Sequence, residues 1–185
     1  MKLVVGLGNP GRRYRDTRHN VGFAVLAELA SLFGTGGVKS KFHGEVVEAN
    51  IGGNKALLLS PLTYMNRSGI SVQEAKSFFK IAEEDILVVC DDLNLPVARI
   101  RFRGKGSSGG QKGLEDIIRH LGTDGFARLR VGIGSPPEGW DWADYVLSRF
   151  TKQETAELEL AVRQAADAVV VWAREGADAC MNQYN

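Results

Sequence analysis

A short apolar run that ends in a glycine-rich turn constrains this chain more than any other stretch. Leu3–Val5 is typical of a buried strand, and the turn Gly6–Gly11 follows it directly. Ligands in open α/β sheets bind just past the carboxyl ends of strands, so the polar segment after this turn is a candidate site. That segment, Arg12–Asn20, holds four arginines, one tyrosine and the first of the three histidines.

The glycine turn also matches the G-x-G-x-x-G pattern of dinucleotide-binding sites, but its surroundings do not. That pattern requires a helix that opens within the glycines, and an acidic residue about 20 positions later at the end of the next strand. Here Pro10 lacks an amide hydrogen, a charged loop follows, and Glu28 lies inside an amphipathic helical pattern. A dinucleotide-dependent oxidoreductase therefore remains an alternative that only nicotinamide binding would revive.

Size and composition fit a single domain that spans residues 1–185, with 44% hydrophobic and 24% charged residues. No apolar run approaches the ~20 residues of a membrane span, and Gly6 and Gly8 interrupt any signal-peptide core. Cys90 and Cys180 are isolated and lack metal-ligand spacing, which favours a reducing cytoplasm. No feature of the pattern demands more than a monomer.

The order of strand-like and helix-like patterns predicts an α/β fold, a mixed β-sheet sandwiched between helices. The predicted strands are Lys2–Val5, Glu45–Ile51, Lys55–Ser60, Ile86–Cys90, Arg99–Arg103 and Arg128–Gly134. The predicted helices are Asn20–Phe33, one that follows the polar loop Thr63–Gly69, Gly113–Leu121, Trp140–Leu147, and one from a capping box at Thr151 to Gly176. In the helix after the polar loop, Ile70, Ala75, Phe78 and Phe79 are expected to pack inward.

Polar residues at the predicted strand ends are typical of a hydrolytic site. Asn9 follows the first strand, Asp91 follows the fourth, and His19 and Asn66 lie in loops after the first and third strands. A neutral imidazole can take a proton from water near pH 7, and a carboxylate on its other nitrogen fixes the tautomer. Carboxamides can donate to a carbonyl oxygen or orient water. The structural alternative is that His19 is a surface residue and that Asp91 and Asn66 merely cap turns.

Basic residues gather in two places on a nearly neutral chain, whose net charge is +1. The first is the loop Arg12–Arg18. The second is Arg99–Arg103, whose strict alternation predicts three arginines on one strand face, with Lys105 close behind. Local basic patches of this kind favour an anionic ligand, although a solvated charged surface is the alternative for each cluster alone.

Four motifs follow one another along the chain: GLGNPGRRYRDTRHNVGF, PLTYMNRSG, DDLNLP and FARLRVGIG, spread over residues 6–134. In order and spacing they closely resemble the bacterial-type peptidyl-tRNA hydrolases. The resemblance implies cleavage of the ester that joins a peptide to the 3′ end of its tRNA, which frees the tRNA for translation. It implies no metal, no cofactor and no membrane partner.

Carried over by position, the resemblance also implies roles for individual residues. His19 corresponds to the general base and Asp91 to its orienting carboxylate, while Asn9 corresponds to the residue that reads the peptide end. Asn66 is implied in catalysis and, like Tyr14 and Tyr64, in lining the pocket for the peptide or the tRNA 3′ end. The positions that correspond to phosphate-binding residues are Arg101, Arg103 and Arg130.

One departure from the family pattern lies at Gly109–Gly113, where Gly-Gly-Gln-Lys-Gly replaces the usual Gly-Gly-His-Asn-Gly. An amide that donates and accepts has become, at Lys112, a cation that only donates. Either the Lys112 ammonium binds a phosphate near the tRNA 3′ end, or it points to solvent and Gln111 takes over the work of the amide. A non-catalytic RNA-binding relative that keeps the basic face is the alternative function.

Overall fold

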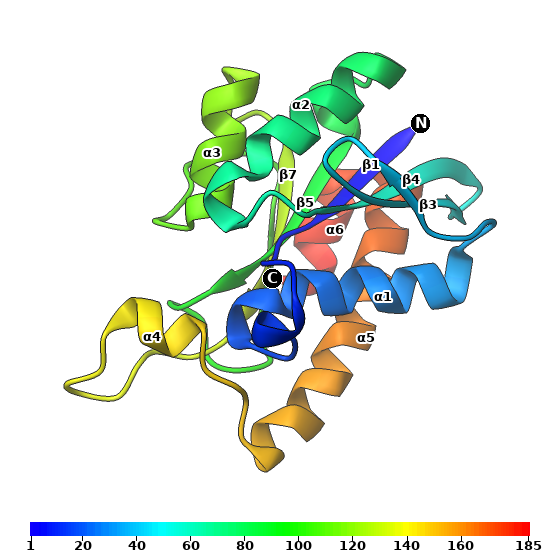
Figure 1. Cartoon of the computed structure of the whole chain (residues 1–185). Helices are drawn as coiled ribbons and strands as arrows, with labels where there is room; N and C mark the ends of the chain where they lie inside the picture. The colour runs from blue at the N-terminus through cyan, green and yellow to red at the C-terminus, as the bar shows by residue number, and fades with distance from the viewer.

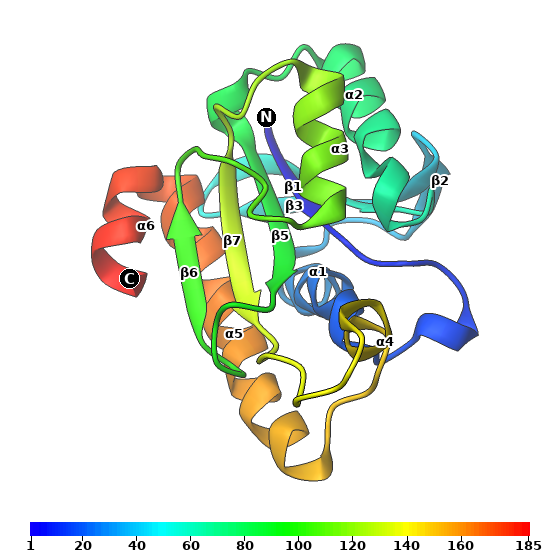
Figure 2. The ribbon, with the colours of Figure 1, turned by 90° about the vertical axis from the view of Figure 1, so that its left-hand side faces the viewer.

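The computed structural model describes all 185 residues and contains one seven-stranded sheet with helices on both faces (Figure 1 and Figure 2). The strands are β1 Lys2–Gly6, β2 Lys39–Lys41, β3 Gly44–Ile51, β4 Asn54–Pro61, β5 Ile86–Asp92, β6 Ile100–Arg103 and β7 Ala127–Gly132. Their order across the sheet is β2-β3-β4-β1-β5-β7-β6. The central strands β4, β1, β5 and β7 run parallel, whereas β3 and β6 are antiparallel to their neighbours. The predicted mixed sheet between helices is confirmed.

Six α-helices accompany the sheet: α1 Val21–Phe33, α2 Ser68–Phe79, α3 Lys112–Leu121, α4 Trp142–Val146, α5 Lys152–Glu175 and α6 Ala177–Tyr184. Single turns of 3₁₀ helix lie at Arg12–Tyr14, Arg18–Asn20, Met65–Arg67 and Glu83–Asp85. The predicted strands and helices all form, and the capping box at Thr151 is present. Strand β2 and helix α6 were not predicted from the sequence.

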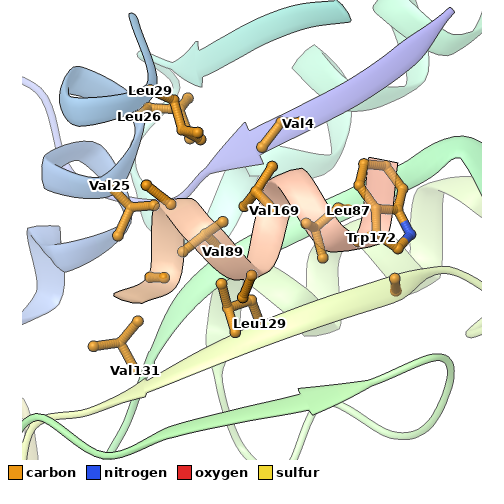
Figure 3. Close-up of a cluster of buried hydrophobic side chains, with 14 of the residues drawn as sticks. Val4, Val25, Leu26, Leu29, Leu87, Val89, Leu129, Val131, Val169 and Trp172 are labelled. Atoms are coloured by element: carbon orange, nitrogen blue, oxygen red, sulfur yellow. The ribbon is translucent and has the colours of Figure 1, made fainter. Parts of the chain in front are cut away.

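Strand alternation supplies one apolar core on each face of the sheet. Val4, Leu87 and Val89 point toward α1 and α5, where side chains such as Trp172 complete the cluster (Figure 3). Their neighbours in the strands point the other way, toward α2 and α3. Because both faces of β1 and β5 are buried, these strands read as continuous apolar runs in the sequence.

Helix α1 packs close against the sheet because each element has a glycine at the contact: Gly22 in α1 and Gly6 at the end of β1. A Cβ atom built on Gly22 would lie 2.5 Å from the Leu7 nitrogen and 2.6 Å from the Val89 oxygen. A Cβ atom built on Gly6 would lie 2.4 Å from the Gly22 oxygen, so both positions exclude a side chain. This close approach places the 3₁₀ turn that carries His19 directly beside the strand ends.

The inward packing expected for Phe78 is wrong. The buried residues of α2 are Ser68, Gly69, Ser71, Val72 and Ala75, and Phe78 falls beside the stripe that they form. Its side chain is 61% exposed and packs on Phe42, at 5.4 Å between ring centroids, with the Lys41 ammonium 3.9 Å from the ring centroid. Helical spacing alone does not show how wide the buried stripe is. Phe42, the ring on which Phe78 packs, comes from the turn after β2 and is distant in the sequence.

Candidate active site

The candidate site lies at the edge of the sheet where the parallel strands β4, β1, β5 and β7 end. Asn9 follows β1, the segment around Tyr64 follows β4, and Asp91 is the penultimate residue of β5. His19 arrives from the 3₁₀ turn that leads into α1. Parallel strands deliver their carboxyl ends to one edge, so segments distant in the sequence converge there.

The closest contact among the candidate residues joins His19 to Asp91. The Nδ1 atom of His19 lies 2.8 Å from Oδ2 of Asp91, whose side chain is only 3% exposed. A carboxylate accepts hydrogen bonds, so the neutral imidazole carries its hydrogen on Nδ1. This leaves Nε2 able to accept a proton.

His19 and Asp91 line a cavity of about 370 Å³ at the carboxyl edge of the sheet. Its walls come from the 3₁₀ turn, the end of β5 with the loop after it, the start of α3 with the loop before it, β7, and α4. The lining residues include His19, Asp91, Asp92, Gln111, Lys112, Arg130 and Trp142. Helix α4 contacts the 3₁₀ turn Arg18–Asn20 that leads into α1, and Figure 2 shows it beside the start of α1. This position lets α4 form one wall of the cavity.

Two further side chains hold the site together: Asn20, to which the sequence assigned no role, and Gln111, which the sequence offered only as a replacement for the usual asparagine amide. Asn20 holds the backbone of Asn9 from both sides: its Oδ1 accepts from the Asn9 nitrogen at 2.8 Å, and its Nδ2 donates to the Asn9 oxygen at 2.9 Å. Gln111 donates from Nε2 to Oδ1 of Asp91 at 3.0 Å. The available signals were the position of Asn20 directly after His19 and that of Gln111 before a predicted helix.

Asn9 fastens the segment after β4 to the site. Its Oδ1 accepts from the Met65 nitrogen at 2.7 Å, while its Nδ2 makes no hydrogen bond within the protein. The preceding residue, Tyr64, has φ +63° and ψ 157°, a combination that only glycine adopts without strain. The hydrogen bond from Met65 therefore helps to hold a strained turn, and the Asn9 amide hydrogens remain available to a ligand.

Tyr14, Tyr64 and Asn66 present a surface of rings and amides beside Asn9. The two tyrosine rings stack edge to face with centroids 6.3 Å apart. Tyr64 and Asn66 are exposed, and the Asn66 carboxamide makes no hydrogen bond within the protein. None of the three lines the cavity that His19 and Asp91 share.

The arginines of β6 and β7 share one face of the sheet. Arg101 pairs with Arg130 and Arg103 pairs with Arg128 across the two strands, and the β6 members of both pairs are exposed. Arg99 precedes the strand instead of joining it, so β6 contributes two arginines and not the expected three. The strand begins one residue later because the Arg99 amide bonds back to the Pro96 oxygen in a turn.

The two β7 arginines hold the glycine-rich loop that precedes α3. Arg130 donates to the Ser107 and Ser108 oxygens, at 3.1 Å and 3.0 Å, and it also lines the cavity. Arg128 is only 1% exposed, and its guanidinium donates to the carbonyl oxygens of the same loop and of the turn before β7. Burial, followed by the charge of Arg130, lowers the pKa of Arg128. Arg128 is thus structural, which its alternating pattern did not reveal.

Lys112 lies at the first position of α3 and its side chain is 70% exposed. Its Nζ is 3.4 Å from Oε2 of Glu115, one turn along the helix. A pair this exposed contributes little stability. Lys112 also lines the cavity.

A partly buried ion pair ties the segment around His19 to α5. Arg18 donates to Oε2 of Glu154 at 2.9 Å and to the Ile133 oxygen at 3.2 Å. Burial alone raises the pKa of Glu154, but hydrogen bonds from the Thr151 nitrogen and from Arg18 outweigh it, so the pKa lies below its usual value. The Arg18 guanidinium also stacks over the Tyr145 ring, 4.5 Å from its centroid.

The remaining reactive side chains do not contribute to the site. Cys90, next to Asp91 in β5, is fully buried, and burial raises the pKa of its thiol to about 12. The other histidines bond elsewhere: His43 pairs with Glu74, and His120 bonds within α3. No group of three or more metal-ligating side chains comes together. None of the helices is both long and apolar enough to span a membrane.

An imidazole oriented by a buried carboxylate, which also accepts a hydrogen bond from an amide at the carboxyl edge of a parallel sheet, defines the class: an α/β enzyme with a hydrolytic site. The sequence profile of the family described as peptidyl-tRNA hydrolase matches residues 3–185. The chain belongs to the peptidyl-tRNA hydrolase family.

Individual relatives agree along the whole chain. A peptidyl-tRNA hydrolase of Rhodopirellula baltica is 53% identical over 185 residues, covering 100% of this chain and 97% of the relative. One of Desulfitobacterium hafniense is 50% identical, with 100% of both chains covered. The crystal structure of peptidyl-tRNA hydrolase from Acinetobacter baumannii superposes with a TM-score of 0.90 at 39% identity, covering 100% of this chain and 94% of that one.

Proposed function

We propose that this protein hydrolyses the ester bond between peptide and tRNA in peptidyl-tRNA, with His19 as the general base. The observation that carries the proposal is the 2.8 Å contact between His19 Nδ1 and the buried Asp91 carboxylate. Membership of the peptidyl-tRNA hydrolase family supplies the substrate class.

The chemistry follows from the tautomer. Nε2 of His19 takes a proton from water, and the water oxygen forms a bond to the ester carbonyl carbon. Asp91 stabilises the imidazolium that results. When the carbon–oxygen bond to the tRNA breaks, the imidazolium returns its proton to the leaving 3′-oxygen. The products are a free peptide carboxylate and a tRNA with an intact 3′ end.

The carboxamides of Asn9 and Asn66 are proposed to bind the carbonyl oxygen and the peptide end, because both carry amide hydrogens without partners in the protein. Tyr14 and Tyr64 offer ring faces and edges on which the last bases of a single-stranded 3′ end can stack. The exposed arginines of β6, Arg101 among them, lie where charge would meet tRNA phosphates.

The proposal is tested with purified peptidyl-tRNA and the variants His19→Ala and Asp91→Asn. His19→Ala is expected to lower kcat by about 10²–10⁴ with nearly unchanged tRNA binding. Asp91→Asn is expected to be impaired less, because it favours the wrong tautomer. His43→Ala is the matched control, since His43 is exposed and lies outside the cavity.

Full turnover by His19→Ala would contradict the mechanism. A parent protein that binds peptidyl-tRNA but releases no peptide would instead favour the non-catalytic RNA-binding alternative.

Residues 1–185 are proposed to form a single domain that acts as a monomer, since one sheet receives strands from both halves of the chain. A cytoplasmic location is proposed because translation supplies the substrate there, and it fits two free, buried cysteines. Sedimentation at working concentration tests the oligomeric state.

A further inference from the structure

Gln111 uses every polar group of its side chain. Its Oε1 accepts from the Leu114 nitrogen at 2.8 Å and so caps the amino end of α3. Its Nε2 lies 3.0 Å from Oδ1 of Asp91 and 3.2 Å from the sulfur of Met65. The residue is 9% exposed and lies at the wall of the cavity.

The capping bond fixes which way the amide faces. A carbonyl oxygen must face the Leu114 hydrogen, so the NH₂ group must face Asp91, and a flipped amide would lose both hydrogen bonds. Gly113 makes the fold-back possible, because a Cβ there would lie 2.7 Å from the Met65 sulfur and 3.1 Å from Oε1 of Gln111. The orientation is therefore set by the helix terminus and not by the site.

The two oxygens of Asp91 then have one fixed donor each. His19 Nδ1 occupies Oδ2 and Gln111 Nε2 occupies Oδ1, and the side chain is 3% exposed. A carboxylate with a single donor can turn about its last torsion, which is broad. A second donor from the opposite side removes that freedom and compensates the buried charge.

We propose that Gln111 is a positioning residue for the hydrolysis: it holds the Asp91 carboxylate in the plane that orients the His19 imidazole. Because the same amide caps α3, the orientation of the carboxylate depends on where the amino end of α3 lies. This inference rests on the proposed function for its kinetic consequence, but not for its geometry. Because both ends of the Gln111 amide are bonded within the protein, Gln111 holds Asp91 and does not replace the usual amide as a contact to the substrate.

The decisive variant is Gln111→Glu. Glutamate keeps an oxygen for the Leu114 nitrogen, and a negative charge at a helix amino end is favourable, so a purely capping role predicts unchanged activity. A positioning role predicts that kcat falls by about 10- to 100-fold with KM unchanged, because a donor to Asp91 is replaced by a second carboxylate. Gln111→Met, which cannot donate, is expected to show the same loss if Gln111→Glu does not fold.

Gln111→His provides the rescue, because one imidazole nitrogen can accept from Leu114 while the other donates to Asp91. Its kcat is expected to stay near that of the parent. The spectroscopic readout is the downfield proton resonance of His19 Nδ1–H, assigned by its absence in His19→Ala. In Gln111→Glu and Gln111→Met that resonance should shift or broaden, and in Gln111→His it should persist.

Because the carboxyl group introduced by Gln111→Glu could share a proton with Asp91 and still donate to it, parental kcat in both Gln111→Glu and Gln111→Met overturns the proposal, and so does a loss of kcat with an unmoved His19 resonance. If the parent itself does not cleave peptidyl-tRNA, the proposed function fails on its own. The resonance still decides whether Gln111 holds Asp91: a shift in the folded variants supports the positioning contact, and no shift overturns it.

Discussion

Replacing Gly22 by alanine tests whether the contact between α1 and the sheet sets the site. The added Cβ would meet backbone atoms of Leu7 and Val89 at 2.5 to 2.6 Å. That is about 1 Å short of a normal van der Waals separation, and the backbone atoms of β5 and of the residue directly after β1 cannot swing aside. The helix must retreat by a similar amount.

The magnitude follows from two opposing effects. Overpacking of this kind costs about 1–3 kcal/mol, and contact with rigid backbone places it near the upper end. Alanine gains back about 1 kcal/mol over glycine within a helix. We therefore expect Gly22→Ala to lower the free energy of unfolding by about 2 kcal/mol. His19 sits three residues before Gly22, so a displacement near 1 Å is expected to reduce kcat by about 10²-fold.

Urea unfolding and peptidyl-tRNA hydrolysis measure the two effects on the same samples. Gly37→Ala is the matched control, since a Cβ there meets nothing within 4 Å; the control is expected to be neutral or slightly stabilised. If Gly22→Ala were as stable as the parent and equally active, the tight helix–sheet contact would not position the site.

Three further outcomes are expected. Replacing Arg101 and Arg103 by alanine should weaken tRNA binding more than it slows hydrolysis, and should reduce the salt dependence of binding by about 0.7–0.9 per lost phosphate contact; equal salt slopes would refute the phosphate assignment. Lys112→Asn should weaken tRNA binding and lower the salt slope by about one, whereas unchanged affinity and slope would leave Lys112 pointing to solvent. Glu154→Gln should lower the free energy of unfolding by about 1 kcal/mol near neutral pH. The pKa of Glu154 is lowered in the folded protein, so its carboxylate stabilises the fold at pH values above the usual pKa of 4.5, and this stabilisation is lost as the pH falls through the lowered pKa. A difference between parent and Glu154→Gln that stays constant down to about pH 3 would contradict that assignment.

Much of the fold could be predicted because its elements carry local signals. The doubly buried strand β5, the hairpin of β3 and β4, and the capping box of α5 each depend on neighbours in the sequence, and each is confirmed. The elements and contacts that the sequence did not predict lack such local signals. Strand β2 has only three residues, all exposed, and Phe78 packs on a ring 36 positions away along the chain.

For the site, the sequence by itself determined which chemical groups are present and that they follow strand ends: an imidazole at His19, a carboxylate at Asp91 and carboxamides at Asn9 and Asn66. Only the tertiary structure decided how they are held. The contact from Gln111 to Asp91 spans 20 positions and that from Asn9 to Met65 spans 56. Local preferences of the chain do not encode such distances, which arise when the sheet brings the ends of its parallel strands to one edge and the helices dock against it.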